Sequence, residues 1–269
     1  MMIAPLVMLF ASAAPVKTLT PVENAWSVLQ YGVKDNSSDR RAQAVHALGS
    51  LIQNHRAQNL VEPALKDSST NVRAEAATSL GRMKATSAIP ALKKALDDDE
   101  IKVVLSAADA LYNLHDPAAY DVYYAILTGE RKGTPGLVES QLNRLKNRKD
   151  LEKLVFETGI GFVPFGSIGY EAWKTITQSD ATLVKVDAAL KLAKDPDPAS
   201  GRALANACED DKWQVRAAAA HAIATRGDTA LLKTLIPLLN DDSDTVRYES
   251  AASLILLSSH PHNRPRSKN

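Results

Sequence analysis

The sequence predicts an all-α protein, an α-solenoid of about six stacked helix pairs with a helical and aromatic insertion in the fourth pair. Three observations favour this fold class. A motif occurs five times in the 269-residue chain, mostly at intervals of about 31 residues. Each copy places small and apolar side chains on one side of a helix. Almost no stretch has the alternation of β-branched and polar residues that is typical of a strand.

The composition is that of a protein with a sizeable core. Hydrophobic residues make up 45% of the chain and charged residues 23%, which excludes disorder of the whole chain. Lysine and arginine together number 32, and aspartate and glutamate together number 31. This balance argues against a general nucleic-acid partner, because phosphate backbones attract proteins with a surplus of positive charge.

The first residues have the features of an export signal. Residues 1–15 contain no charged side chain, residues 3–10 form an apolar run, and small residues follow at 11–14. We predict a signal peptide over residues 1–14, cleaved after Ala13 or Ala14, and a protein that is periplasmic or secreted. Because no basic residue precedes the apolar run, the alternative is a buried N-terminal helix in a cytoplasmic protein. The run is too short to span a bilayer.

The repeat domain is expected to extend over residues 20–257. Thr20, Pro21 and Glu23 fit a capping box, with threonine at the N-cap, proline at the first helical position and glutamate at the third. At the other end, residues 258–269 contain prolines and three basic side chains, so we expect a disordered tail there.

The repeated motif is clearest over residues 67–80. Val72 and Arg73 follow Asp67 near its start. Val72, Ala76 and Leu80 are spaced by four residues and therefore fall on one side of a helix, where the alanine lets a neighbouring helix approach closely. The other copies are Asp35–Leu48, Asp98–Leu111, Asp210–Ile223 and Asp241–Leu254.

Amphipathic segments between these copies complete the helix pairs. Asp116, Asp197 and Asp228 are candidate N-caps, and a proline follows the first two of them. The helices predicted after them cover residues 118–127, 199–207 and 231–239.

The order of acid, valine, arginine, alanines and leucine resembles HEAT repeats, in the short bacterial form called phycobilin-lyase HEAT-like, over residues 21–257. The resemblance implies a solenoid of HEAT-like pairs, which is a scaffold used for many binding tasks and a few chemistries. It also implies that the aspartate and the arginine of the motif are structural and tie each unit to the next. The residues concerned are Asp67, Arg73, Asp210, Arg216, Asp241 and Arg247.

The fourth pair carries the insertion. Val104 and Arg216 occupy the same motif position, but about 50 more residues separate them than two repeats require. Residues 118–127 and 183–193 are interpreted as the two helices of the pair, and residues 130–179 as the insertion.

The insertion concentrates aromatic side chains. Residues 158–170 are uncharged and contain four glycines. The aromatics can anchor an interface, because exposed aromatic residues often dominate binding energy, or they can pack against the neighbouring repeats. A transient contact of residues 158–170 with a membrane surface is a third interpretation. The candidates for partner binding in this segment are Phe162, Phe165, Tyr170 and Trp173.

The sequence shows no constellation for catalysis, metal binding or cofactor binding. Its six histidines form no His-x-x-x-His or His-Glu-x-x-His motif, and the His-Glu pairs of iron-binding HEAT-like hydroxylases are missing. Cys208 is the single cysteine and falls among core-like alanines, and Ser167 is outside a nucleophile elbow. We therefore expect no enzyme activity and no cofactor.

The remaining candidate site is a surface. The second helices of HEAT pairs usually line the concave side of the solenoid, and here their outward positions, counted from Val72, are polar and of mixed charge. Such a groove suits a protein or peptide better than nucleic acid. The residues predicted to bind the partner are Gln43, His46, Glu75, Thr78, Ser106, Asp109 and His221; the other outward positions include Ser50, Arg82, Asn113 and Thr225.

These observations predict a non-catalytic protein–protein interaction scaffold. The partner is a protein or peptide that binds on the concave face, through the aromatic insertion, or both. The alternative is an accessory HEAT-like protein that handles a cofactor or chromophore in the manner of a lyase, as the resemblance to phycobilin lyases implies.

Overall fold

The computed structural model describes residues 19–128 and 180–259. Within these two stretches every regular element is an α-helix or a 3-10 helix, so the prediction of an all-α solenoid is confirmed. The predicted signal peptide, the insertion and the tail beyond Ser259 lie outside the described residues.

The first stretch holds three repeats and one further helix. Its elements are α1 (Pro21–Gly32), α2 (Ser38–Leu48), α3 (His55–Val61), η1 (Glu62–Lys66), α4 (Thr70–Arg82), η2 (Thr86–Ala88), α5 (Ile89–Ala95), α6 (Ile101–Asn113) and α7 (Ala118–Thr128).

The second stretch begins with one helix and continues with two repeats. Its elements are α11 (Asp180–Leu192), α12 (Pro198–Ala207), α13 (Trp213–Arg226), η3 (Thr229–Leu231), α14 (Leu232–Leu235), η4 (Pro237–Asn240) and α15 (Asp244–Ser259).

The five copies of the motif form the five helices α2, α4, α6, α13 and α15, as predicted. The last apolar residue of the motif is completely buried in every copy, at Leu48, Leu80, Leu111, Ile223 and Leu254. The capping box is also confirmed. The amide of Glu23 donates to Thr20 Oγ1 at 3.2 Å, and the amide of Thr20 donates to Glu23 Oε2 at 2.8 Å.

Two boundaries differ from the prediction. The helix expected over residues 231–239 is divided. The 3-10 turn η3 precedes α14, and η4 replaces α-helix from Pro237, which lacks the amide that would continue the α-helical hydrogen bonds. At the C-terminus, α15 continues to Ser259, two residues into the segment expected to be a disordered tail.

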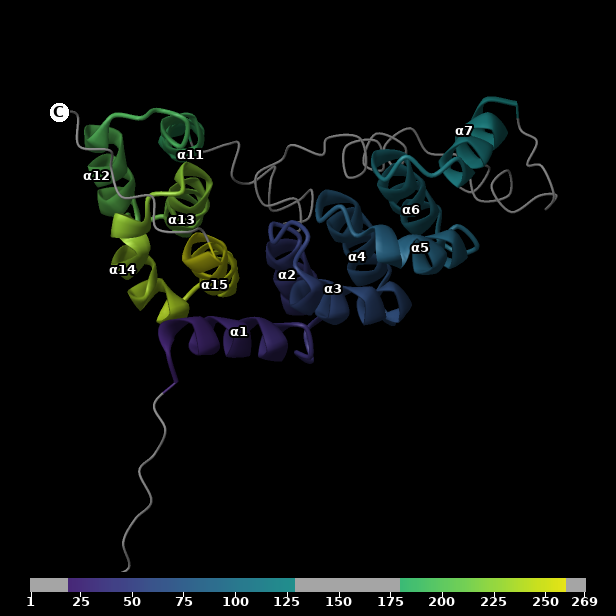
Figure 1. Cartoon of the computed structure of the whole chain (residues 1–269), viewed down its shortest axis with the longest axis horizontal. Helices are drawn as coiled ribbons and strands as arrows, with labels where there is room; N and C mark the ends of the chain where they lie inside the picture. Colours follow the sequence, from purple (N-terminus) through teal and green to yellow (C-terminus); the bar gives the residue numbers. More distant parts are fainter. Residues whose placement is uncertain (1–18, 129–179, 260–269) are drawn as a thin grey trace, which may run out of the picture.

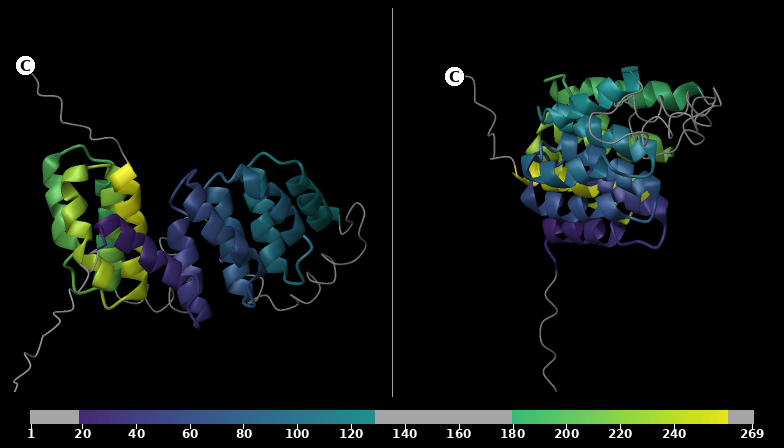
Figure 2. Two further views of the ribbon diagram at one scale, coloured as in Figure 1. Left: turned by 60° about the horizontal axis from the view of Figure 1, so that its bottom comes forward. Right: turned by 90° about the vertical axis from the view of Figure 1, so that its right-hand side faces the viewer.

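The described helices form an arch of two layers (Figure 1). We call α2, α4, α6, α11, α13 and α15 the inner helices, and their chain neighbours α1, α3, α5, α12 and α14 the outer helices. Adjacent inner helices pack on one another, as α2 does on α4 and α4 on α6. In the right-hand view of Figure 2, α1 (purple) lies at the lower edge of the helices.

The last repeat stacks on the first. Besides its chain neighbours, α15 packs extensively against α1 and also against α2. The inner helices therefore follow the spatial order α6, α4, α2, α15, α13, α11. In this order the first and last repeats of the described chain, which contain α2 and α15, are neighbours. We call the contact of α15 with α1 and α2 the terminal junction.

The predicted fourth pair is divided. Helix α7 packs on α6, whereas α11 packs on α12 and α13, so the two helices lie at opposite ends of the arch (Figure 1). The interpretation of residues 118–127 and 183–193 as one packed pair is therefore wrong, because each helix stacks on its neighbour in sequence.

Arginines of the motif tie each unit to the next, as the resemblance implied. Arg73 donates from Nε and Nη2 to the Asp98 carboxylate at 2.7 and 3.0 Å, and from Nη1 to the carbonyl of Asp67 at 2.9 Å. The Asp67 carboxylate in turn accepts from the Ser69 amide at 2.8 Å. The same arrangement joins Arg41 to Asp67 and Arg216 to Asp241. Lys185 takes the place of the arginine opposite Asp210.

Arg247 departs from this pattern. It donates to the carbonyls of Asp241 and Asp242 like the other motif arginines, but its carboxylate partner is Asp244 of its own helix. The tie to the next unit in space is made instead by Arg40, whose Nε lies 3.0 Å from Asp244 Oδ2.

Candidate functional site

The polar positions of the inner helices form the candidate site, which we call the inner face. The structure brings three of the seven predicted residues of this face together, namely His46, Glu75 and His221. Two residues outside that set of seven, Arg82 and Glu249, complete the group. We call these five residues the His–Glu cluster.

His46 and Glu75 bridge α2 and α4. His46 Nδ1 lies 2.9 Å from Glu75 Oε1, and the two side chains are only 14% and 13% exposed. Arg82 Nη2 donates to the same Glu75 oxygen at 3.2 Å and to the carbonyl of His46 at 2.9 Å. These contacts occupy the polar atoms that the sequence predicted to face a partner.

Glu249 on α15 lies between the two histidines. Its Oε1 is 3.9 Å from His46 Nε2, its Oε2 is 3.8 Å from His221 Nδ1, and the side chain is 6% exposed. Sequence reasoning missed this residue, although it has a signal: Glu249 follows Arg247 by two residues, as Glu75 follows Arg73.

The cluster repeats one contact in the same register. His46 and His221 each lie five residues after the motif arginine of their unit, and each faces the glutamate two residues after the arginine of the next unit. The contact of His46 with Glu249 connects these two histidine–glutamate contacts across the terminal junction. The cluster therefore extends over α13, α15, α2 and α4.

The charges of the cluster shift one another's pKa values. Burial raises the pKa of Glu249, but its interactions with His221, His46 and Arg82 more than offset this, so the pKa lies below its ordinary value. The pKa of Glu75 is lowered for the same reason, with burial opposed by His46 and Arg82. The facing carboxylate of Glu249 raises the pKa of His221 above 6.5, and burial opposes this shift.

The predicted exposure of the inner face is wrong for several residues. Ser106 is buried, at 6% exposure, because adjacent inner helices pack closely. Gln43 is only partly exposed, and the partly exposed Thr78 donates its hydroxyl to the carbonyl of Ala74 at 3.1 Å. Asn113 and Thr225 are exposed as expected.

Asp109 belongs to a tyrosine group at the end of α6. The Tyr123 hydroxyl donates to Asp109 Oδ1 at 2.5 Å, and burial raises the pKa of Asp109. The ring of Tyr112 meets those of Tyr120 and Tyr123 edge to face, with centroids 6.1 and 6.2 Å apart. Tyr112 and Tyr120 remain 52% and 60% exposed, so they offer aromatic surface that the sequence analysis did not single out.

Three further features of the described residues concern metal binding, thiol reactivity and membrane-spanning helices. Within residues 19–128 and 180–259, no group of three or more His, Cys, Asp or Glu side chains could hold a metal ion. Cys208 is buried, and burial raises its pKa to about 12, so it remains a thiol at neutral pH. None of the described helices is both long and apolar enough to cross a membrane.

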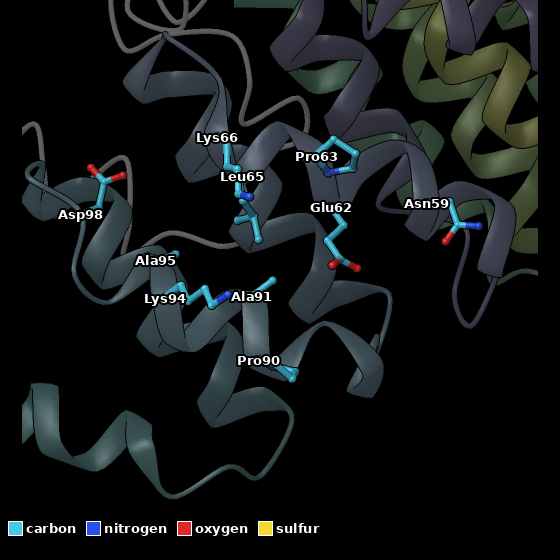
Figure 3. Close-up of a pocket in the computed structure, with 10 residues that line it drawn as sticks. All are labelled: Asn59, Glu62, Pro63, Leu65, Lys66, Pro90, Ala91, Lys94, Ala95 and Asp98. Atoms are coloured by element: carbon cyan, nitrogen blue, oxygen red, sulfur yellow. The ribbon is translucent and has the colours of Figure 1, made fainter.

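The outer side carries a pocket of about 830 Å³ between η1 and α5 (Figure 3). Pro63 and Pro90 line it, together with Lys66, Lys94 and Asp98. The Asp98 carboxylate is already held by Arg73. The pocket lies on outer elements, whereas the His–Glu cluster lies on inner helices.

Four predicted residues lie outside the described part of the chain. They are the aromatic candidates of the insertion, Phe162, Phe165, Tyr170 and Trp173.

The chain belongs to the HEAT-repeat family. The family model for HEAT repeats matches residues 26–127 and 171–255, which is more than half of the chain. The search of curated proteins found no match.

Two solved structures are similar at low identity. Human deoxyhypusine hydroxylase in complex with glycerol is 19% identical, with a TM-score of 0.32, and the match covers 88% of this chain and 85% of that chain. The complex of CpcE and CpcF of phycocyanin lyase from Nostoc sp. is 18% identical, with a TM-score of 0.35, and the match covers 93% of this chain and 100% of that chain. At these scores neither structure bears on what this chain binds.

Proposed function

We propose that this HEAT-repeat protein is a non-catalytic scaffold that binds an extended protein or peptide segment along its inner face. The observation that carries this proposal is the layer of inner helices, which continues from α6 through the terminal junction to α11. Stacked units suit extended ligands because each unit adds another set of contact positions in the same register.

The chemistry of the inner face supports a protein partner. The His–Glu cluster places acidic and basic side chains next to one another, with Glu75 beside His46 and Arg82, and Glu249 beside His221, instead of gathering one kind. At the α6 end of the arch, Tyr112 of α6 and Tyr120 of α7 present exposed rings, and tyrosine is enriched among the residues that dominate binding energy at protein interfaces.

The chain offers a matched pair of tyrosines to test this proposal. Tyr112 is on an inner helix and 52% exposed, and Tyr31 is on the outer helix α1 and 79% exposed. In affinity capture with the immobilised protein, Tyr112→Ala should weaken binding of the captured partner by about tenfold or more. Tyr31→Ala should leave it unchanged. Equal binding by both variants and the wild type would rule out this end of the inner face.

The predicted role of the aromatic insertion is tested in the same assay. A version without residues 158–170 should retain helical circular dichroism and bind more weakly if Phe162, Phe165, Tyr170 and Trp173 contact the partner. Unchanged binding would assign recognition to the inner face alone.

We also propose that the protein is exported, which the uncharged and apolar residues 1–14 support. Mass spectrometry of the protein from the producing cells should then find an N-terminus at Ala14 or Pro15, in the periplasmic or secreted fraction. A cytoplasmic chain that begins at Met1 or Met2 would contradict export.

A further inference from the structure

Glu249 is buried by the terminal junction. We call residues 19–128 and 180–259 the two halves of the described chain. Helix α15 lies between α13, which is in the same half, and α2, which is in the other half. The carboxylate faces His221 from α13 and His46 from α2, and it also interacts with Arg82 from α4. A buried carboxylate is stable only while these partners compensate for its lost hydration.

Other charged groups at the junction act elsewhere. Asp35, Arg40, Asp244 and Arg247 act on Tyr248, the residue before Glu249, and Arg40 pairs with Asp244. The charge around Glu249 is therefore set by the His–Glu cluster itself.

Protonated His221 and Arg82 together offset the carboxylates of Glu75 and Glu249. When His221 loses its proton, the buried Glu249 loses a charged partner. Such a carboxylate gains free energy by returning to water.

We propose that the terminal junction is a pH-responsive lock, closed while His221 is protonated beside Glu249 and loosened when His221 loses its proton. Helices α13 and α15 are connected in the chain through η3, α14 and η4, whereas α2 meets α15 only by packing. The junction therefore opens in preference to the contact of α13 with α15. Movement of α2 away from α15 hydrates Glu249 and leaves the stacking within each half intact.

The pKa shifts give the direction of the response. Because the pKa of His221 is raised above 6.5, its contribution to stability is fully present below that value and is lost as pH rises through the raised pKa. The pKa values of Glu75 and Glu249 are lowered, so their contribution is lost only in acid, as pH falls through those lowered values. Raising the pH should therefore loosen the lock.

Hydrogen exchange of the full chain, read by mass spectrometry, tests the lock at about pH 6 and about pH 9. After correction for intrinsic exchange rates, peptides from α1 and α15 should exchange several-fold faster at the higher pH, while peptides from α6 should not change. An equal change in α6, or no change in α1 and α15, would overturn the proposal.

Variants separate the lock from a general effect of pH. Glu249→Gln removes the buried charge and should abolish the difference between the two pH values, whereas His55→Gln, at an exposed histidine of α3, should behave as wild type. If Glu249→Gln retains the wild-type response, the proposal is wrong. If circular dichroism shows that Glu249→Gln does not fold, His221→Gln takes its place as the test variant. The α15 peptides of His221→Gln should exchange rapidly at both pH values. A pH response of these peptides equal to that of the wild type would also overturn the lock.

Discussion

At the scale of single residues, three of the motif arginines, Arg41, Arg73 and Arg216, each serve two units. Arg73 holds the turn before its own helix through the carbonyl of Asp67, and it holds the next unit through the carboxylate of Asp98. Asp98 in turn accepts from the amide of Glu100 at the start of α6. One guanidinium therefore fixes both a turn and the stacking of two repeats.

Replacement of Arg73 tests this double role. Arg73→Gln should lower the free energy of unfolding by about 2 kcal/mol, because it removes a two-point charged contact and leaves Asp98 without its partner. Urea denaturation measures this change. Arg202→Gln, at an exposed arginine of α12, is the control and should change stability by less than about 0.5 kcal/mol. Similar losses in both variants would contradict the assigned role of Arg73.

The residues of the candidate site could be predicted only in part. Periodicity placed His46, Glu75 and His221 on one side of their helices, which is correct. It could not show that these side chains contact one another, because the distance between units depends on how closely the helices stack. Glu249 has the register of Glu75 and could have been predicted from it, but its contact with His46 could not, because that contact depends on the packing of the last repeat against the first.

At the scale of elements, the second helices of the repeats were the most predictable. Their alanines and evenly spaced apolar residues specify a helix and its buried side. The first helices have weaker patterns, and prolines interrupt them at Pro63 and Pro237, where 3-10 turns replace α-helix.

One motif position limits how closely adjacent inner helices can approach. Gly81 lies where an added Cβ would be 2.8 Å from the Cα of Ala110, so a small residue is required between α4 and α6. The corresponding position of the preceding repeat is Gly49, but that of the following repeat is Tyr112. There the Tyr112 ring meets those of Tyr120 and Tyr123 on α7.

At the scale of the whole molecule, the spatial order of the repeats could not be read from the sequence. The period identifies which segments are equivalent, and neighbouring copies are expected to stack. It contains no information about whether the first and last copies meet. Their contact places α7 and α11 at opposite ends of the arch and makes the inner face continuous through the termini.

The terminal junction is most directly tested by a double-mutant cycle between Gly32 and Tyr248. A Cβ at Gly32 would lie 2.5 Å from Tyr248 Cε1 across the junction, so Gly32→Ala should destabilise the protein by about 1–3 kcal/mol. In a Tyr248→Ala background the ring is absent, and the same substitution should cost less, which gives a coupling of about 1 kcal/mol or more in urea denaturation. If the two substitutions are additive, the last repeat does not stack on the first.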